Sequence, residues 1–283
     1  MPAIRSNPIV ATSMSRRVLG WVCVLLWFGL GLGSGQAQST RGDLVLIKGR
    51  LHADLGLWGA KNGLRGSWNP TSGELRFSNR WINLLFKADT ARVELDGVLV
   101  WLEFPIAVER GRPYIAQRDL DQTLMPLLRP AKGVPGRKIR RVAISAGHGG
   151  KDPGNMEGGR QEKHYTLKLA RELGARLRAA GFEVILVRDE DEFIELDDRP
   201  EKANRLKADL YLSLHFNGAG GRGSTTANGL ETFSLTLPGG RSTGGGNSTG
   251  VQAGNRFDKE NLVLAYQVHR SLVQALDFAD RGI

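Results

Sequence analysis

An alternation of short apolar runs with amphipathic segments, across residues 140–217, constrains the fold of this chain more than any other feature. Three runs are short and apolar, which predicts buried strands at residues 142–146, 182–187 and 210–214. Between them, one segment repeats apolar residues at helical spacing and stops at Gly181, and residues 196–206 predict a second helix. This order predicts an α/β fold with a mostly parallel sheet and helices on both of its faces.

Three metal-binding residue types stand where these predicted elements change direction. His148 follows the first strand inside a glycine-rich turn, Glu162 opens the first helix, and His215 follows the third strand. Ligands collect beyond the carboxyl ends of parallel strands, so we expect the three side chains to face one rim of the sheet. Two histidines and one carboxylate match the protein ligands of an open catalytic zinc site. Taken singly, each has a simpler interpretation, such as a surface histidine or a glutamate that complements the helix dipole, and spacing alone names neither metal nor reaction.

Several stretches of the second half of the chain resemble the zinc-dependent N-acetylmuramoyl-L-alanine amidases of bacterial cell-wall turnover. The resemblance covers roughly residues 140–283 and rests on GHGGKDPGN (147–155), GRQEK (159–163), the long stretch VILVRDEDEFIELDDRPEKANRLKADLYLSLHFN (184–217), GLETFSL (229–235) and NLVLAYQVHRSL (261–272). It implies that His148, Glu162 and His215 bind Zn²⁺ and that the substrate is peptidoglycan. The resemblance also implies that the bond cut is the amide between N-acetylmuramic acid and L-alanine. Asn217, in the family's HxN arrangement, is a candidate for orienting the substrate or the loop.

One expected residue of the resembled family has no counterpart here. The general base of that family is a glutamate on a late strand, in a segment that follows the point at which this sequence stops, Ile283. We therefore leave the catalytic residue unassigned and expect an amidase domain that is incomplete at its C-terminus, with little hydrolysis by these 283 residues alone. The alternatives are a non-catalytic or truncated zinc-containing wall-binding protein and a zinc exopeptidase of similar fold.

The first 37 residues have the three-part layout of a secretory signal peptide. Arginines precede an apolar run of about 15 residues, which is shorter than the roughly 20 that a membrane-spanning helix needs. Arg16 and Arg17 also resemble a twin-arginine export signal. We expect export to the periplasm or cell envelope, with no membrane span after cleavage. The one cysteine, Cys23, lies inside this segment, so disulfides and thiolate chemistry are excluded for the mature chain.

Charge favours an anionic partner. The chain carries a net charge of +10, and removal of the three arginines of the predicted signal peptide lowers it to +7. The basic residues are scattered, and no base-stacking motif accompanies them, which argues against nucleic acid. For an exported protein the anionic polymers of the wall are the expected counterpart, and solubility alone is the other explanation of the charge. An activating protein partner is a further possibility.

Residues 41–130 have a different pattern, of short alternating strands, that predicts a small β-rich (α+β) domain. Asp96-Gly97 between two apolar runs is a strong hairpin signal, and residues 97–128 resemble the small N-terminal module of copper amine oxidases. We interpret this domain as a targeting or spacer module. The proline- and glycine-rich residues 131–137 predict a linker, which leaves residues 138–283 as the zinc amidase domain.

Other residues are assigned by the simpler interpretation. Asp152 and Glu157 lie in the turn after His148, where each is solvated, a metal ligand or a partner of the ligands, and solvation is the ordinary case for an acid in a loop. His164 is not counted as a ligand, because two positions from Glu162 a helix faces another side. We predict a surface position for His52, the polar side of the last helix (258–276) for His269, and core packing rather than a sugar-binding surface for Trp58, Trp68, Trp81 and Trp101.

Overall fold

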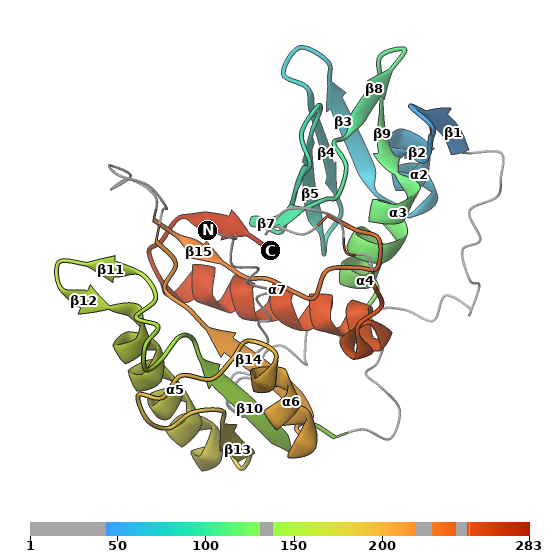
Figure 1. Cartoon of the computed structure of the whole chain (residues 1–283). Coiled ribbons are helices and arrows are strands. Elements are labelled where there is room, and N and C mark those ends of the chain that lie inside the picture. Colours follow the sequence, from blue (N-terminus) through green and yellow to red (C-terminus); the bar gives the residue numbers. More distant parts are fainter. Residues whose placement is uncertain (1–43, 131–137, 219–227, 242–247, 249) are drawn as a thin grey trace. The chain divides into compact units, whose positions relative to one another are not determined.

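A computed structural model describes residues 44–130, 138–218, 228–241, 248 and 250–283 (Figure 1). These residues form two compact units, each of which is described here by itself. The central unit contains residues 138–218, 228 and 233–235, and the β-rich unit contains residues 44–130, 229–232, 236–241, 248 and 250–283. The predicted signal peptide (1–37) and linker (131–137) lie outside the described residues.

The β-rich unit is built on two antiparallel sheets. One has the order β1-β2-β9-β8 and the other the order β3-β4-β5-β6-β7. The predicted hairpin is confirmed: Leu95 pairs with Val98, and Asp96 and Gly97 have φ values of 50° and 79°, as a type I′ turn requires. The strands are β1 (Leu44–Ile47), β2 (Arg50–Asp54), β3 (Arg65–Asn69), β4 (Glu74–Ser78), β5 (Asn83–Lys87), β6 (Arg92–Leu95), β7 (Val98–Trp101), β8 (Ala107–Glu109) and β9 (Arg112–Ala116).

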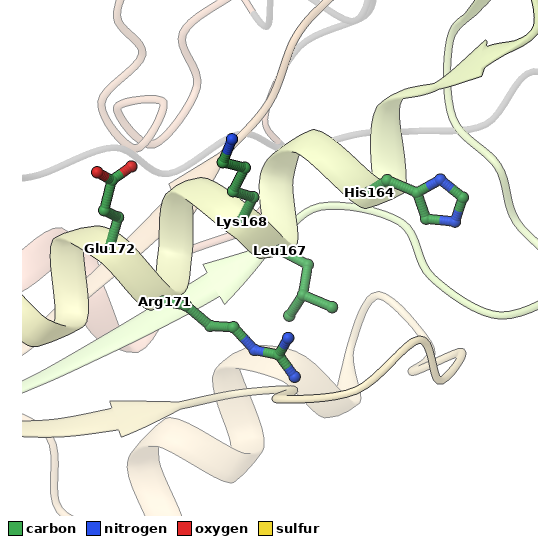
Figure 2. Close-up of a pocket in the computed structure, with 5 residues that line it drawn as sticks. All are labelled: His164, Leu167, Lys168, Arg171 and Glu172. Atoms are coloured by element: carbon green, nitrogen blue, oxygen red, sulfur yellow. The ribbon is translucent and has the colours of Figure 1, made fainter.

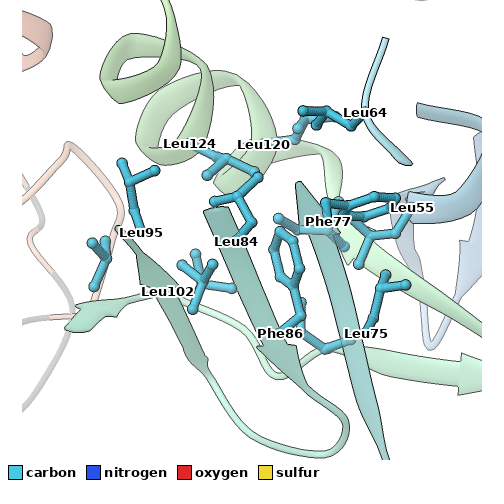
Figure 3. Close-up of a cluster of buried hydrophobic side chains, with 14 of the residues drawn as sticks. Leu55, Leu64, Leu75, Phe77, Leu84, Phe86, Leu95, Leu102, Leu120 and Leu124 are labelled. Atoms are coloured by element: carbon cyan, nitrogen blue, oxygen red, sulfur yellow. The ribbon is translucent and has the colours of Figure 1, made fainter. Parts of the chain in front are cut away.

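Short helical segments close the core of this unit. Alternate residues of β4 and β5 point inward and meet Leu120 and Leu124 (Figure 3). Asp54 caps the first helix by accepting a hydrogen bond of 2.9 Å from the backbone N–H of Leu57. The helical segments are α2 (Leu55–Lys61), α3 (Gln117–Asp119), the π-helical η2 (Leu120–Leu124) and α4 (Met125–Leu128).

The tryptophans and His52 differ in part from expectation. Trp58 and Trp68 pack against the core, as predicted, whereas Trp81 and Trp101 are 52% and 49% exposed. The surface position predicted for His52 is wrong, because this side chain is only 4% exposed. His52 lies on β2, between β1 and β9 in the sheet, and its Nδ1 lies 2.9 Å from the carbonyl oxygen of Arg50.

The C-terminal elements belong to the β-rich unit. Tyr266 of α7 is buried in its core and donates a hydrogen bond of 3.0 Å to the carbonyl oxygen of Leu95. The backbone of Ile283 continues the five-stranded sheet, with N–H to Leu99 O at 3.1 Å and O from Trp101 N–H at 2.9 Å. The compact units divide residues 138–283 between them, and the predicted amidase domain over that range stays a prediction. The elements are β15 (Leu230–Glu231), the 3-10 helix η3 (Ala253–Phe257), α7 (Asp258–Ala275) and β16 (Asp280–Gly282).

A chain of polar groups links α7 to β16 and to the residue after β15. We call Thr232, His269 and Asp280 the buried triad, although Asp280 is itself 18% exposed. Nδ1 of His269 lies 2.9 Å from Oγ1 of Thr232, and Nε2 lies 2.8 Å from Oδ1 of Asp280. The polar-side position predicted for His269 is wrong, since its side chain is 0% exposed. The reason is that this face of α7 packs against the segments of β15 and β16, which supply one polar partner for each ring nitrogen.

The central unit carries a sheet of three parallel strands in the order β13-β10-β14. The mixed α/β content and the N-terminal β-rich region are confirmed, but a mostly parallel sheet holds only for this unit, because the larger sheets of the chain are antiparallel. The elements are β10 (Arg141–Ala146), β11 (Met156–Glu157), β12 (Arg160–Gln161), α5 (Glu162–Ala179), β13 (Glu183–Leu186), α6 (Asp198–Arg205) and β14 (Leu210–Leu214).

Helices α5 and α6 pack against opposite faces of this sheet (Figure 1). Gly174 of α5 lies so close to Val184 and Leu186 that a methyl group there would touch both, while Ala203 of α6 packs with Ala143. Side chains alternate between faces along a strand and its register partners, which places these two contacts on different sides. None of the helices in the described part of the chain combines the length and apolarity that a membrane span needs.

Candidate metal centre

The structure brings His148, Glu162 and His215 together at one edge of the central sheet. Their candidate ligand atoms all lie within 4.8 Å of one another. Nε2 of His148 is 3.1 Å from Oε2 of Glu162, and Nδ1 of His215 is 3.1 Å from Oε1 of the same carboxylate. The pairing of β10 with β14 explains the proximity, since the two histidines follow the carboxyl ends of neighbouring parallel strands.

Glycines make room for the imidazole rings. A methyl group on Gly147 would overlap the ring of His215, and one on Gly154 would overlap the ring of His148 and the Cβ of Glu162. Gly154 also has φ of +69°, in the left-handed region that side chains other than glycine rarely adopt. The glycine-rich turn is therefore part of the site, because larger residues would displace the candidate ligands.

Groups of the chain itself stabilise the ionised form of Glu162. Its side chain is 3% exposed, and its two oxygens accept hydrogen bonds from the backbone N–H groups of Phe216 (2.8 Å) and Asn155 (2.9 Å). Burial alone would raise the pKa of Glu162, but these bonds and the two histidines outweigh it and hold the pKa well below its usual range. One anionic group thus faces both rings.

Asp152 orients the ring of His148. Its Oδ2 lies 2.8 Å from Nδ1, and its Oδ1 accepts a hydrogen bond of 3.0 Å from the N–H of Gly154. The hydrogen bond to Glu162 raises the pKa of His148, burial opposes this, and the bond to Asp152 adds to the rise. A carboxylate on one ring nitrogen commonly fixes the tautomer that leaves the other nitrogen for a metal. Of the interpretations open for Asp152, the geometry favours a partner of the site.

The remaining candidates lie outside the cluster. Glu157 is exposed on β11, and the side chain of His164 is 59% exposed. Asn217 is exposed two residues beyond His215, and its role stays a prediction. Two buried arginines beside the turn, Arg188 and Arg199, were missed by the sequence analysis, because a charged residue at a strand end or in a charged helix ordinarily indicates exposure.

A hollow of about 450 Å³ lies along the flank of α5, away from the three candidate ligands. Figure 2 shows Leu167 and Arg171 extending toward the segment after β13, whereas Lys168 and Glu172 point away from it. His164 completes the lining. Because the lining contains none of the cluster residues, we assign the hollow no part in metal binding.

The donor set fits zinc. Tetrahedral zinc with bonds of about 2.0–2.1 Å places its ligand atoms roughly 3.4 Å apart. Here each histidine nitrogen lies 3.1 Å from a different oxygen of Glu162, and the three candidate ligand atoms lie within 4.8 Å of one another, so the match rests on the donor types and their proximity. The two histidine side chains are 24% and 28% exposed, so solvent reaches the cluster. A site with three protein donors and solvent access is the arrangement of a catalytic rather than a structural zinc.

The comparison with known proteins decides the family. Residues 142–283 match the N-acetylmuramoyl-L-alanine amidase family Amidase_3, which is half of the chain. The chain belongs to this family. All three cluster residues lie inside the part that matches the amidase family.

Individual amidases show the same similarity. The chain is 38% identical over 135 residues to the amidase AmiC of Neisseria meningitidis serogroup B, and 34% identical over 146 residues to the sporulation-specific amidase of Bacillus subtilis. These matches cover 47% and 50% of this chain but only 30% and 47% of the relatives. The solved catalytic domain of the amidase CwlV from Bacillus (Paenibacillus) polymyxa var. colistinus is 31% identical, with 51% of this chain and 68% of that chain covered and a TM-score of 0.38.

Proposed function

We propose that the protein is a zinc-dependent amidase that cuts peptidoglycan between N-acetylmuramic acid and L-alanine, with His148, Glu162 and His215 as the zinc ligands. The observation that carries the proposal is the convergence of these three side chains within 4.8 Å at a solvent-accessible edge of the sheet. Membership of the amidase family and the amidases among its relatives support the substrate and the bond.

The chain's own residues would prepare the site. Glu162 supplies the negative charge that partly neutralises a divalent ion, and its hydrogen bonds from Asn155 and Phe216 keep both oxygens directed at the histidines. Asp152 holds the ring of His148 through Nδ1, so that Nε2 is the donor. Bound zinc polarises a carbonyl group and lowers the pKa of water to about 7. Proton transfer to the leaving amine needs a further carboxylate, because the three ligands are committed to the metal.

The remaining parts of the proposal concern context. The protein would be exported, by the predicted signal peptide, to the periplasm or cell envelope, where the anionic wall is the partner. The β-rich residues 41–130 would serve as a targeting or spacer module, and Asn217 would orient substrate beside His215. An activating protein stays a prediction from the family resemblance.

The decisive experiment measures zinc and product on the same protein. We expect one zinc ion per chain. Release of peptides that begin with L-alanine from purified peptidoglycan is expected of a protein that also carries the general base of the family. The double variant His148→Ala/His215→Ala should lose both, while His164→Ala, on an exposed side chain of the same unit, should keep both.

Each alternative has its own outcome. Zinc bound with wall binding but no product, even from a protein that carries the general base of the family, favours a wall-binding protein. Cleavage of free peptides in preference to muramyl peptides favours an exopeptidase. A wild-type protein that binds no zinc contradicts the ligand assignment.

A further inference from the structure

Two buried guanidinium groups lie directly behind the turn that carries His148. Arg188 is 1% exposed and Arg199 is 5% exposed. Every hydrogen bond that the structure gives them ends on a backbone carbonyl or a hydroxyl oxygen. A buried charge is costly unless hydrogen bonds compensate it, so these bonds must be well placed for the folded chain to retain both arginines.

Arg188 joins the two segments that carry His148 and Glu162. On the strand side its Nε donates to the carbonyl of Ala146 at 3.0 Å, and its Nη2 donates to that of Gly147 at 2.8 Å. On the helix side the same Nη2 donates to the carbonyl of Lys163 at 2.8 Å. Two of the residues bonded, Gly147 and Lys163, are therefore the immediate neighbours of the candidate ligands His148 and Glu162.

Arg199 reaches the same turn from α6. Its Nη1 donates to the carbonyl of Ala146 at 2.8 Å, and its Nη2 donates to the carbonyl of His148 itself at 2.9 Å. Nε donates to Ile194 O at 3.0 Å, which fixes the guanidinium plane. The carbonyls of residues 146–148 are thus held by donors from both helical faces of the sheet.

The turn needs such support because its backbone is unusual. His148 has φ of +58°, and Gly149 and Gly150 follow with +132° and +55°. A non-glycine residue in this region is strained and persists only where the surroundings impose it. Arginine suits the task, because it offers several N–H donors in one rigid plane, which lysine does not.

We propose that Arg188 and Arg199 are positioning residues for the metal centre. They hold the carbonyls of Ala146, Gly147 and His148 so that the strained turn directs Nε2 of His148 at Glu162. The inference rests on the proposed function, because positioning has meaning only if the cluster binds a metal.

The test compares metal binding with folding. Arg199→Lys keeps the charge and loses the planar set of donors, and Thr166→Val removes only a hydroxyl that donates to Gly147 O at 2.8 Å and accepts from Arg188. The control is Arg171→Lys, a 54% exposed arginine of α5 that pairs with Asp189. For each protein we would measure the zinc dissociation constant by chelator competition, the absorption spectrum with Co²⁺, and thermal unfolding without metal.

We expect Arg199→Lys to weaken zinc binding about 10- to 100-fold, the size found when groups that orient metal ligands are lost, with an altered Co²⁺ spectrum. Thr166→Val should weaken it several-fold, and the control should match the wild type. Wild-type affinity and spectrum in both variants would overturn the inference. If Arg199→Lys does not fold, the isosteric Thr166→Val decides. A wild-type chain that binds no metal would instead refute the proposed function.

Discussion

Two histidine–carboxylate clusters in this chain use nearly the same chemical groups in opposite ways. In the central unit, His148 and His215 face the carboxylate of Glu162 at 3.1 Å each, with a quarter of each ring exposed. In the buried triad of the β-rich unit, His269 bridges Thr232 and Asp280 and is 0% exposed. The order hydroxyl, imidazole, carboxylate is that of a nucleophilic site, yet Thr232 is only 2% exposed. The two clusters therefore differ in solvent access and in whether lone pairs remain available to a metal. These two properties separate a candidate binding site from a structural network.

Loss of His215, a solvent-accessible candidate ligand, should have the largest effect, and that effect is on zinc affinity. We expect His215→Ala to weaken zinc binding by more than about 1,000-fold, because one of three protein ligands disappears. Unfolding of the metal-free protein should change little, since the ring is partly exposed. Chelator competition and thermal unfolding measure the two effects, with His164→Ala as control. Retained affinity would remove His215 from the ligand set.

Loss of His269, the fully buried histidine, should lower the stability of the protein and leave its zinc affinity unchanged. His269→Ala leaves Asp280 and Thr232 without their partner in a buried position, for which we expect a loss of about 3–4 kcal/mol in the free energy of unfolding of the β-rich unit. Zinc affinity should match the wild type. Denaturant titration measures the loss, and Lys259→Ala, on an exposed residue of α7, is the control. A drop in zinc affinity without a loss of stability would contradict a purely structural triad.

The buried carboxylates of the two units differ as well. Burial raises the pKa of Asp119 to about 6, although the N–H groups of Glu103 and Phe104 oppose the rise. The pKa of Glu162 is lowered instead, because two histidines and two backbone N–H groups bind its carboxylate and outweigh its burial. Because the folded pKa of Asp119 exceeds its unfolded value, its contribution to stability is fully present below about pH 4 and lost as pH rises through about 6.

Relative to Asp119→Asn, the wild type should lose about 2 kcal/mol of unfolding free energy between pH 4 and pH 7, because each pKa unit corresponds to about 1.4 kcal/mol and part of the change lies below pH 4. Denaturant titration of both proteins at the two pH values measures this difference. The variant serves as its own control, since all other titrating groups are shared. If the stability of the wild type instead rises with pH relative to the variant, the carboxylate of Asp119 is charged in the folded state over the whole range.

The smallest change concerns orientation in the open cluster. Asp152→Ala removes the group that holds Nδ1 of His148 and should weaken zinc binding about 10- to 100-fold. Chelator competition measures it, and Glu157→Ala, an exposed acid of the same turn, is the matched control. Equal affinity in the two variants would mean that the backbone of the turn alone directs the ring.

Much of the central unit could be predicted because its signals are local. The apolar run before Gly147 became β10, and the helical repeat that ends at Gly181 became α5. Parallel pairing then brought the residues after β10 and β14 to one edge. The proximity of His148, Glu162 and His215 follows from this order, which the sequence contains.

Other features depended on contacts between distant segments. The helical period of α7 indicated an apolar face. The sequence does not indicate which surface that face packs against, and in the structure α7 packs in the β-rich unit. His52 was predicted to be exposed because its neighbours in sequence offered no partner, and His269 was placed on the polar side of the last helix because apolar residues defined the other face. Arg188 and Arg199 gave no sign of burial, since the carbonyls that bind them become available only when the turn is folded.

The amino-acid sequence by itself determined the strand and helix order of the central unit, the hairpin at Asp96-Gly97 and the three candidate ligands. Only the tertiary structure decided which histidines are open to solvent, where the last helix packs and what supports the turn of His148. The physical reason is the sequence distance over which each interaction acts. Periodicity and turn residues act over a few positions, whereas burial and hydrogen-bond partners are set by segments that meet only after folding.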